Sequence, residues 1–364
     1  HPTLEYQTGS IRNDFDFGQL LLFRNDSFQQ VVAQMNTDYR FAALYELRLS
    51  ISRLGKIVHI PETLYTVQPT DLRLSGEKQF DYVDPANREV QLEMEAVCTA
   101  HLQAIGAWLA PEFQRIDFGQ ENFAREASVI IPVRNRKRTI AEAVESALQQ
   151  QTDFSFNVIV VDNHSTDGTG QILTELSRRY PNLIHHIPAS TELGIGGCWT
   201  EAILLPECGK FAIQLDSDDL YKDCHVLQRI VDTFYQENCA MVIGSYQMVD
   251  FKLEEIPPGL IAHREWTPDN GRNNALRING LGAPRAFYTP VLRQIKFPNV
   301  SYGEDYATAL AISRKYPIAR IYDPLYLCRR WEENSDHDLD IQQLNNYNFY
   351  KDKIRTLEIQ ARIS

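Results

Sequence analysis

Three aspartates, Asp216, Asp218 and Asp219, lie within four residues of one another in the stretch QLDSDDLY, residues 214–221. They directly follow the apolar run FAIQL, which is typical of a buried strand. Carboxylates grouped in this way can hold a divalent metal ion, because hard cations prefer oxygen ligands. An acidic turn before a helix would use the same residues, since an aspartate there satisfies orphan backbone N–H groups. These eight residues alone favour the acidic turn.

Three further acids, Asp162, Glu304 and Asp305, stand where they could support chemistry. Asp162 ends the run NVIVVD and is followed by a polar turn. Glu304 and Asp305 are adjacent at the start of the helical pattern YGEDYATALAISRKY. A carboxylate can take a proton from a substrate hydroxyl, whereas acids at a helix start also interact favourably with the helix dipole. The residues alone leave both interpretations open.

Short β-branched runs alternate with amphipathic helical patterns from about residue 126. Strands are expected at residues 127–133, 157–162, 183–189, 210–215 and 240–249, and helices at 139–151, 170–180, 198–206 and 226–237. Such alternation predicts a doubly wound α/β sheet. Ligands of these sheets bind beyond the carboxyl ends of the strands, where Asp162 and Asp216 are expected. This context favours a ligand site. Loops around residues 245–300, where residues 254–284 are rich in Pro, Gly and Asn, are expected to set specificity.

The composition excludes several classes of protein. The chain of 364 residues carries 36 Lys and Arg against 48 Asp and Glu, a formal net charge of −12. This balance argues against nucleic-acid binding, which needs a basic face, and against strong attachment to anionic lipid. No apolar run approaches about 18 residues, so no membrane-spanning helix is expected. Six cysteines are scattered without a C-x-x-C pair, which favours reduced thiols and a cytoplasmic protein.

Several familiar signatures are absent from the sequence. There is no G-x-G-x-x-G, no P-loop and no G-x-S-x-G elbow, which disfavours the enzymes that depend on them. The chain begins with His-Pro-Thr instead of methionine, so we expect a fragment of a longer protein.

Four motifs occur in the order ASVIIPVRNR, VIVVDNHSTDGT, QLDSDD and YGEDYATAL. Together they resemble the family 2 glycosyltransferases, which are inverting enzymes of GT-A fold. The resemblance covers roughly residues 126–335. It implies a GT-A doubly wound mixed α/β sheet flanked by helices, to which an additional N-terminal α+β lobe would be attached.

The resemblance assigns the donor site to residues at the ends of the first strands. Pro132 and Val133 would lie beside the nucleotide base, and Asp162 would accept hydrogen bonds from the base or ribose. Asn163 stands where many relatives carry a second acid, so the identity of the base stays open. Asp216 would lean towards the ribose of the donor.

The resemblance also assigns the metal, the base and the acceptor contact. Asp218 would coordinate a Mg²⁺ or Mn²⁺ ion that bridges the diphosphate of the donor. Asp305 matches the catalytic base, which takes a proton from the acceptor hydroxyl as it attacks. Glu304 would hold the acceptor or tune the base.

The segment CRRWEENSDHD, residues 328–338, matches a part of the family that folds over the diphosphate. Arg329 and Arg330 would bind the diphosphate, since a guanidinium suits phosphate oxygens, although either could pair with a surface acid. Trp331 would stack on the acceptor sugar, or belong to the core. His337 would be a further metal ligand.

One region departs from the family pattern. Relatives carry an arginine and an asparagine in the helix after the glycine cluster, where this chain has Trp199 and Thr200 in GIGGCWTEAI. Trp199 would pack against the donor sugar, or it would fill space in the core.

The first part of the chain shows an internal similarity. Residues 52–67 align without a gap with residues 313–328, and Asp38 then lies opposite Asp305 across a gap. We therefore expect the N-terminal region to copy the acceptor half of a second glycosyltransferase-like domain, with chance similarity as the alternative. The expected organisation is a partial module at 1–80, a helical linker at 81–125, a GT-A domain at 126–340 and a C-terminal helix at 341–364.

The expected function is metal-dependent transfer of a sugar, with inversion, from a nucleotide-sugar donor to a glycan or lipid-linked oligosaccharide acceptor in polysaccharide biosynthesis. Any membrane contact would be peripheral, on the cytoplasmic face. The first alternative is a catalytically degenerate glycan-binding or scaffold protein, favoured by the changes at Asn163, Trp199 and Thr200. The second is a nucleotidyltransferase, although PVRNRKRTIAEA lacks the glycines of its basic loop.

Overall fold

The computed structural model describes residues 3–18, 20–36, 38–66, 87–119, 121–331 and 340–364. The chain divides into two compact units, each built from separate stretches of sequence. The first unit comprises His1–Pro111, Arg264–Gly280 and Asp338–Ser364. The second comprises Glu112–His263 and Leu281–His337.

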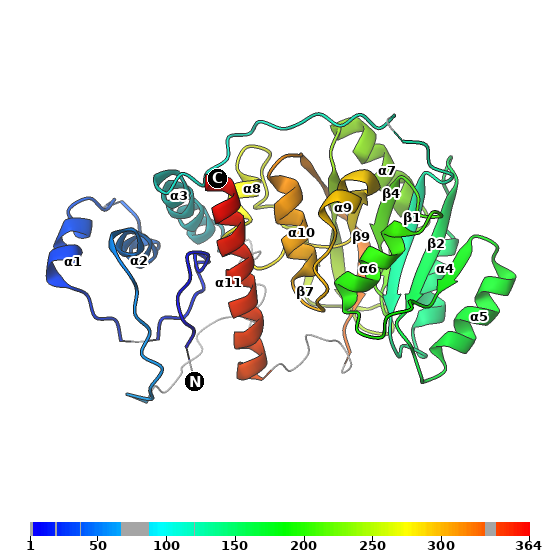
Figure 1. The fold of residues 1–364 in the computed structure, drawn as a ribbon, viewed down its shortest axis with the longest axis horizontal. Helices are drawn as coiled ribbons and strands as arrows, with labels where there is room; N and C mark the ends of the chain where they lie inside the picture. Colours follow the sequence, from blue (N-terminus) through cyan, green and yellow to red (C-terminus); the bar gives the residue numbers. More distant parts are fainter. Residues whose placement is uncertain (1–2, 19, 37, 67–86, 120, 332–339) are drawn as a thin grey trace. The chain divides into compact units, whose positions relative to one another are not determined.

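The second unit is built on one mixed sheet, drawn in Figure 1. Its strands are β1 (Ala127–Val133), β2 (Phe156–Asp162), β3 (Leu183–His186), β4 (Phe211–Gln214), β5 (Leu220–Tyr221), β6 (Met241–Val249), β7 (Glu255–Ile261), β8 (Arg285–Tyr288) and β9 (Ile318–Arg329). Among the described residues the order is β3-β2-β1-β4-β8-β6-β9-β5, and β7 pairs with β6. β1, β2, β3 and β4 run parallel, whereas β8 is antiparallel to both of its neighbours.

The central strands are apolar at nearly every position because both faces of the sheet are covered. In β1 only Pro132 is not fully buried, and in β2 only the first residue, Phe156. Pro132 lacks a backbone N–H, which is normally excluded from a central strand. It is tolerated here because the pairing of β1 with β4 ends at Ile130, two residues earlier.

Two groups of helices contact the parallel strands. The helices of this unit are α4 (Ile140–Leu148), α5 (Thr169–Arg179), α6 (Ile195–Leu204), α7 (Val226–Glu237), α9 (Thr289–Ile295) and α10 (Glu304–Ser313). α4 contacts β1, β2 and α5, while α6 contacts β1, β2, α9 and α10. In α7 the buried residues recur at helical spacing, and Phe234 stacks on Phe211 of β4 with 4.3 Å between ring centroids.

The glycine cluster allows α6 to approach the loop that leads into α10. A Cβ on Gly196 would lie 2.0 Å from the carbonyl oxygen of Pro298, and one on Gly197 would lie 2.3 Å from Oδ1 of Asn299. Trp199 is buried, with its ring 5.2 Å from the Phe297 ring. Of the two interpretations of Trp199, the structure therefore agrees with core packing.

Residues 254–284, expected as loops, include a strand. β7 forms an edge of the sheet through its pairing with β6. Pro257 and Pro258 are compatible with an edge strand because an edge leaves some backbone N–H groups without a ladder partner. The region around residues 245–300, where loops were expected, thus also contains regular secondary structure.

The first unit contains five described helices. They are α1 (Asn25–Val32), α2 (Ala43–Leu54), α3 (Arg88–Ala104), α8 (Gly271–Asn274) and α11 (Ile341–Ile363). None of the helices in the described ranges is long and apolar enough to cross a membrane. All six cysteines of the chain are free thiols.

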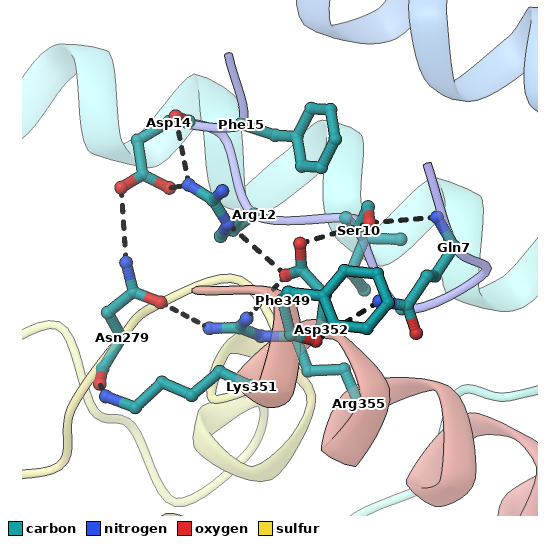
Figure 2. Close-up of polar contacts among 12 residues, drawn as sticks. Gln7, Ser10, Arg12, Asp14, Phe15, Asn279, Phe349, Lys351, Asp352 and Arg355 are labelled. Atoms are coloured by element: carbon teal, nitrogen blue, oxygen red, sulfur yellow. Dashed lines mark hydrogen bonds and ion pairs between the residues drawn. The ribbon is translucent and has the colours of Figure 1, made fainter. Parts of the chain in front are cut away.

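A buried charge network joins distant segments of the first unit, as Figure 2 shows. Asp352 of α11 has a side chain that is only 1% exposed. Its carboxylate accepts hydrogen bonds from Ser10 at 3.1 Å, from Arg12 at 3.3 Å and from Arg355 at 2.8 Å. Arg355 also donates to Oδ1 of Asn279 at 2.6 Å. One carboxylate thus ties the N-terminal segment to α11.

The internal similarity can be followed in the secondary structure. α2 and α10 both end at or next to a Ser-Arg pair, and β9 follows α10. Residues 56–66, which correspond to most of β9, contain no strand. Leu64 is 59% exposed, whereas its counterpart Leu325 is fully buried. The partial-domain origin of the N-terminal region and the expected domain limits stay predictions.

Candidate active site

The ends of β1 and β2 place four predicted residues together. The β1–β2 register pairs Pro132 with Val161 and Val133 with Asp162. The backbone N–H of Asn163 continues this pairing by donating to the carbonyl oxygen of Val133 at 2.8 Å. These residues lie at the carboxyl edge of the parallel strands, where ligands of such sheets bind.

Asp162 is buried and hydrogen-bonded through both carboxylate oxygens. Its Oδ1 accepts the backbone N–H of Ser165 at 2.9 Å, and its Oδ2 lies 3.2 Å from Nε2 of His185 on β3. Burial by itself would raise the pKa of Asp162. The hydrogen bonds from His185 and Ser165 outweigh burial and hold the pKa below its ordinary value. Asp162 is therefore an ionised acceptor at neutral pH.

Asn163 presents a buried acceptor that lacks a partner. Its Nδ2 donates to the carbonyl oxygen of Leu193 at 2.8 Å, which fixes the orientation of the amide. Its Oδ1 is buried and has no hydrogen-bond partner within the described residues. Because such an acceptor is costly to leave unpaired, it marks a place where a ligand N–H would be favourable.

The three aspartates after β4 point in different directions. Gln214 donates to both carboxylate oxygens of Asp216, at 2.9 and 3.0 Å. Asp219 is buried and accepts the backbone N–H of Arg329 at 2.8 Å, so it joins this turn to the end of β9. Burial, followed by the nearby Asp218 and Asp216 carboxylates, raises the pKa of Asp219 well above its ordinary value. Asp219 thus has a structural role in this turn.

Asp218 is held by side chains that flank the end of β9. The indole Nε1 of Trp331 donates to Oδ2 of Asp218 at 3.1 Å, and Nε of Arg136 lies 3.7 Å from the same oxygen. The Arg136 and Arg138 guanidinium groups lie over the Trp331 ring, at 5.7 and 5.4 Å from its centroid. Trp331 therefore lies beside the carboxylate predicted to bind the metal.

Asp305 is the second residue of α10 and forms an ion pair with Arg285 of β8. Its side chain is 29% exposed, so it can be reached from solvent. Gln214 accepts from the Arg285 backbone N–H at 3.1 Å and from Nε at 3.0 Å. The side chains of Gln214 and Arg285 thereby connect Asp216 to Asp305.

Glu304, the first residue of α10, has a strongly perturbed pKa. Burial is the largest cause and the adjacent Asp305 carboxylate is the next, and together they raise its pKa to about 8. Its Oε2 is buried without a hydrogen-bond partner within the described part of the chain. Glu304 is therefore protonated at neutral pH and carries a carboxylic O–H that can donate.

The arginines of the 328–338 segment have different surroundings. The guanidinium of Arg329 is buried and contacts Glu142 and the carbonyl oxygen of Asp218. The backbone N–H of Arg330 donates to the carbonyl oxygen of Val249 at 2.9 Å. His337, predicted as a metal ligand, lies outside the described residues.

The donor groups present are compatible with a divalent ion shared with a substrate. The described residues hold no cluster of three or more His, Cys, Asp or Glu side chains placed for a metal. Mg²⁺ commonly binds one or two carboxylates and completes its coordination with waters and substrate phosphates. Asp218, whose side chain is 14% exposed, would supply such a carboxylate.

Sequence reasoning missed Gln214, Arg285 and His185. Two of them carried a signal, because Gln214 interrupts the apolar run FAIQL and Arg285 interrupts APRAFY. A polar residue inside a short buried strand must find hydrogen-bond partners. Nothing in the sequence, however, indicated which partners these would be.

Residues 128–295 match the family described as Glycosyl transferase family 2. This stretch runs from β1 to α9 and includes Asp162, Asp216 and Asp218, so the family match covers the residues predicted to bind the donor and the metal. The expected GT-A α/β fold is confirmed, as is the assignment to the glycosyltransferase class. Glu304 and Asp305 lie beyond the matched residues.

Curated relatives agree with this class. An uncharacterized glycosyltransferase of Nostoc sp. strain PCC 7120 is 32% identical over 34% of this chain and 37% of its own length. A poly(ribitol-phosphate) beta-glucosyltransferase of Bacillus spizizenii is 24% identical over 61% of this chain and 35% of its own length. A Bacillus subtilis protein, provisionally named a teichuronic acid biosynthesis glycosyltransferase, is 26% identical over 53% of this chain and 74% of its own. The chain thus spans little more than a third of the first two relatives.

Two solved structures are also similar to this chain. Residues 1–349 of TarS from S. aureus, in complex with UDP, have a TM-score of 0.48 and 22% identity over 64% of this chain and 65% of that chain. The mannosyltransferase PcManGT from Pyrobaculum calidifontis, in complex with GDP-Man and Mn²⁺, has a TM-score of 0.46 and 15% identity over 76% of this chain and 84% of that chain.

Proposed function

We propose that the second unit transfers a sugar, with inversion, from a nucleotide-sugar donor to a hydroxyl of a glycan or lipid-linked acceptor. The observation that carries this proposal is the connection between Asp216 and Asp305 through Gln214 and Arg285. It places the aspartate motif after β4 and the acidic start of α10 at one edge of the sheet. A transferase needs donor and base groups within reach of one another.

The donor would be bound along the ends of β1, β2 and β4. Pro132 and Val133 would flank the base, Asp162 would accept from the base or ribose, and Asn163 Oδ1 would accept a base N–H. Asp216 would contact the ribose. A Mg²⁺ or Mn²⁺ ion held by Asp218 would offset charge on the leaving diphosphate.

Asp305 would be the general base. As an ionised carboxylate it would take the proton of the acceptor hydroxyl while that oxygen attacks the sugar carbon from the face opposite the leaving group. Glu304, protonated at neutral pH, would hold the acceptor by donating a hydrogen bond. Trp331 would offer an apolar ring to the sugar, and Arg330 a cation to the diphosphate.

The acceptor proposed here is a growing cell-surface polymer. The relatives from Bacillus spizizenii and Bacillus subtilis are named for poly(ribitol-phosphate) and teichuronic acid, which supports a polymer hydroxyl as the acceptor.

The test of this function is product formation from UDP-, GDP- and dTDP-linked sugars with Mn²⁺, using wild type, Asp305→Asn and the exposed control Asp232→Asn. We expect Asp305→Asn to lower kcat by about 10²- to 10⁴-fold and to leave nucleotide affinity within about twofold. Asp232→Asn should behave as wild type, and NMR of the product should show inverted anomeric configuration. Normal transfer by Asp305→Asn, or retained configuration, would contradict the mechanism.

A further inference from the structure

Gln214 and Arg285 are neighbours across two adjacent strands. The antiparallel register of β4 and β8 pairs Ile213 with Ala286, so Gln214 and Arg285 come next to each other at the end of the ladder. Oε1 of Gln214 accepts two hydrogen bonds from Arg285, one from the backbone N–H at 3.1 Å and one from Nε at 3.0 Å.

The orientation of the Gln214 side chain is fixed. Its Nε2 donates to both oxygens of Asp216, while its Oε1 receives the two Arg285 donors. A flipped amide would place its oxygen against a carboxylate and its N–H groups against a guanidinium. Because Gln214 is buried in an apolar strand, these bonds are needed to offset the loss of water.

Arg285 is held at two points of its planar guanidinium. Nε donates to Gln214, and Nη1 forms the ion pair with Oδ2 of Asp305. A guanidinium carries a permanent charge and a rigid fork of donors, so fixing Nε also fixes the direction of Nη1. The position of Gln214 therefore determines where Arg285 presents its charge to Asp305.

Asp305 needs such a cation because its surroundings are acidic. Within the described residues, the titratable and charged groups around this cluster include Arg285 of β8, Asp216 after β4, Glu304 and Asp305 of α10, and Tyr326 of β9. Like charges at short range oppose the ionisation of a carboxyl group. Without Arg285, the negative charge of Asp216 would favour a protonated Asp305, which could not accept a proton.

We propose that Arg285, oriented by Gln214, is the positioning residue of the catalytic base: it fixes the Asp305 carboxylate and keeps it ionised. Arg285 acts through Asp305 and does not itself contact substrate. Because Gln214 also binds Asp216, the same pair links the position of the base to the donor side of the site. This inference rests on the proposed transferase function of the second unit.

The test is the pH dependence of nucleoside diphosphate release, between pH 5 and 9, from the UDP-, GDP- or dTDP-linked sugar that wild type turns over with Mn²⁺ and its acceptor. Arg285→Met removes the charge but keeps an apolar stem of similar length. Arg285→Lys keeps the charge but cannot reach Gln214 and Asp305 together. Arg293→Met is the matched control, since Arg293 of α9 binds backbone carbonyls of Ile203 and Leu205.

We expect Arg285→Met to lower kcat at pH 7 by about 100-fold and to move the acidic limb of the profile up by about one pH unit or more. In Arg285→Lys the acidic limb of the pH profile should stay near that of wild type, while kcat should be about tenfold lower. Gln214→Met should also lower kcat, with a smaller change in the limb. In the two Arg285 variants the donor KM should change less than about threefold.

Two outcomes overturn the inference. An unchanged acidic limb and kcat in Arg285→Met means that Arg285 does not act on the base. If Arg285→Met does not fold, the other two variants decide. A kcat equal to that of wild type in both Arg285→Lys and Gln214→Met also means that Arg285 does not act on the base. A folded wild type that binds no nucleotide and releases no nucleoside diphosphate would instead refute the proposed function, and the inference with it.

Discussion

The indole N–H of Trp331 donates a hydrogen bond to the Asp218 carboxylate, with 3.1 Å between Nε1 and Oδ2. Trp331 lies just beyond the end of the long strand β9, whereas Asp218 belongs to the turn after β4. Contact of Trp331 with the acceptor sugar stays a prediction. The hydrogen bond indicates a second role for Trp331, which is to orient the Asp218 carboxylate. A group that orients a metal-binding carboxylate affects the affinity for the metal.

Trp331→Phe removes this N–H and keeps an aromatic ring. We expect the Mn²⁺ concentration that gives half-maximal nucleotide binding to rise about tenfold, because the Asp218 carboxylate loses an orienting partner. Titration of Mn²⁺ at fixed nucleotide, followed by calorimetry, measures this change. Binding at saturating Mn²⁺ should match wild type, and an unaltered Mn²⁺ requirement would show that the hydrogen bond has no effect on the metal.

Asn163→Leu tests how the base is recognised. Oδ1 of Asn163 is a buried acceptor whose orientation is fixed by the bond from Nδ2 to Leu193. Wild type should therefore prefer UDP, dTDP or GDP, whose bases carry a ring N–H, over CDP and ADP, whose corresponding ring nitrogen is an acceptor. In Asn163→Leu, the ratio of the affinities for these two groups of nucleotides should fall about tenfold. Equal discrimination by both proteins in competition binding would exclude Asn163 from base recognition.

Glu304→Gln should change the pH dependence of stability. The pKa of Glu304 rises from an ordinary 4.5 to about 8 on folding. The contribution of Glu304 to the free energy of unfolding is therefore fully present below about pH 4.5 and is lost as the pH rises through 8. Between these values the folded state retains a proton that the unfolded state has released. Glutamine cannot lose a proton, so the variant should lack this loss.

Urea unfolding of wild type and Glu304→Gln at several values between pH 5 and 9 measures this difference. The free energy of unfolding of wild type, relative to the variant, should decrease steadily up to about pH 8. The exposed control Glu175→Gln should show no such trend. A difference that does not depend on pH would mean that Glu304 is ionised in the folded protein.

Asp352→Asn tests the charge network of the first unit. Asp352 is the shared partner of Arg12 and Arg355, and its side chain is almost inaccessible to solvent. Removing one member of a buried ion cluster leaves uncompensated charge, so we expect a loss of about 3–5 kcal/mol in the free energy of unfolding. The exposed control Asp26→Ala should unfold at nearly the same denaturant concentration as wild type. Similar denaturation midpoints for the two variants would contradict this account of the network.

The sequence predicted the parallel half of the sheet because β1, β2 and β4 are short, continuous apolar runs closed by polar turns. The same runs located Asp162 and Asp216, since the carboxyl ends of parallel strands share one edge. The position of β8 between β4 and β6 was not predicted. Its neighbours in the sheet come from distant parts of the chain, and local periodicity does not report such pairing.

The hydrogen-bond partners of the buried polar groups also could not be predicted from the sequence. Gln214 and Arg285 are 71 residues apart, and only the β4–β8 register brings them together. The grouping of residues 264–280 with the N-terminal region has the same origin, since it depends on contacts such as Arg277 with Asn13 and Gln91. Packing between distant segments decides both features.

The measurement that tests the central claim most directly is calorimetric binding of UDP, GDP and dTDP, with and without Mn²⁺, to wild type and Asp218→Ala. We predict that wild type binds one of the three tightly only when Mn²⁺ is present, and that Asp218→Ala loses this metal-dependent binding while remaining folded. If folded wild type binds none of them, or if Asp218→Ala binds as well as wild type, the assignment of a metal-dependent donor site to the edge of this sheet is wrong.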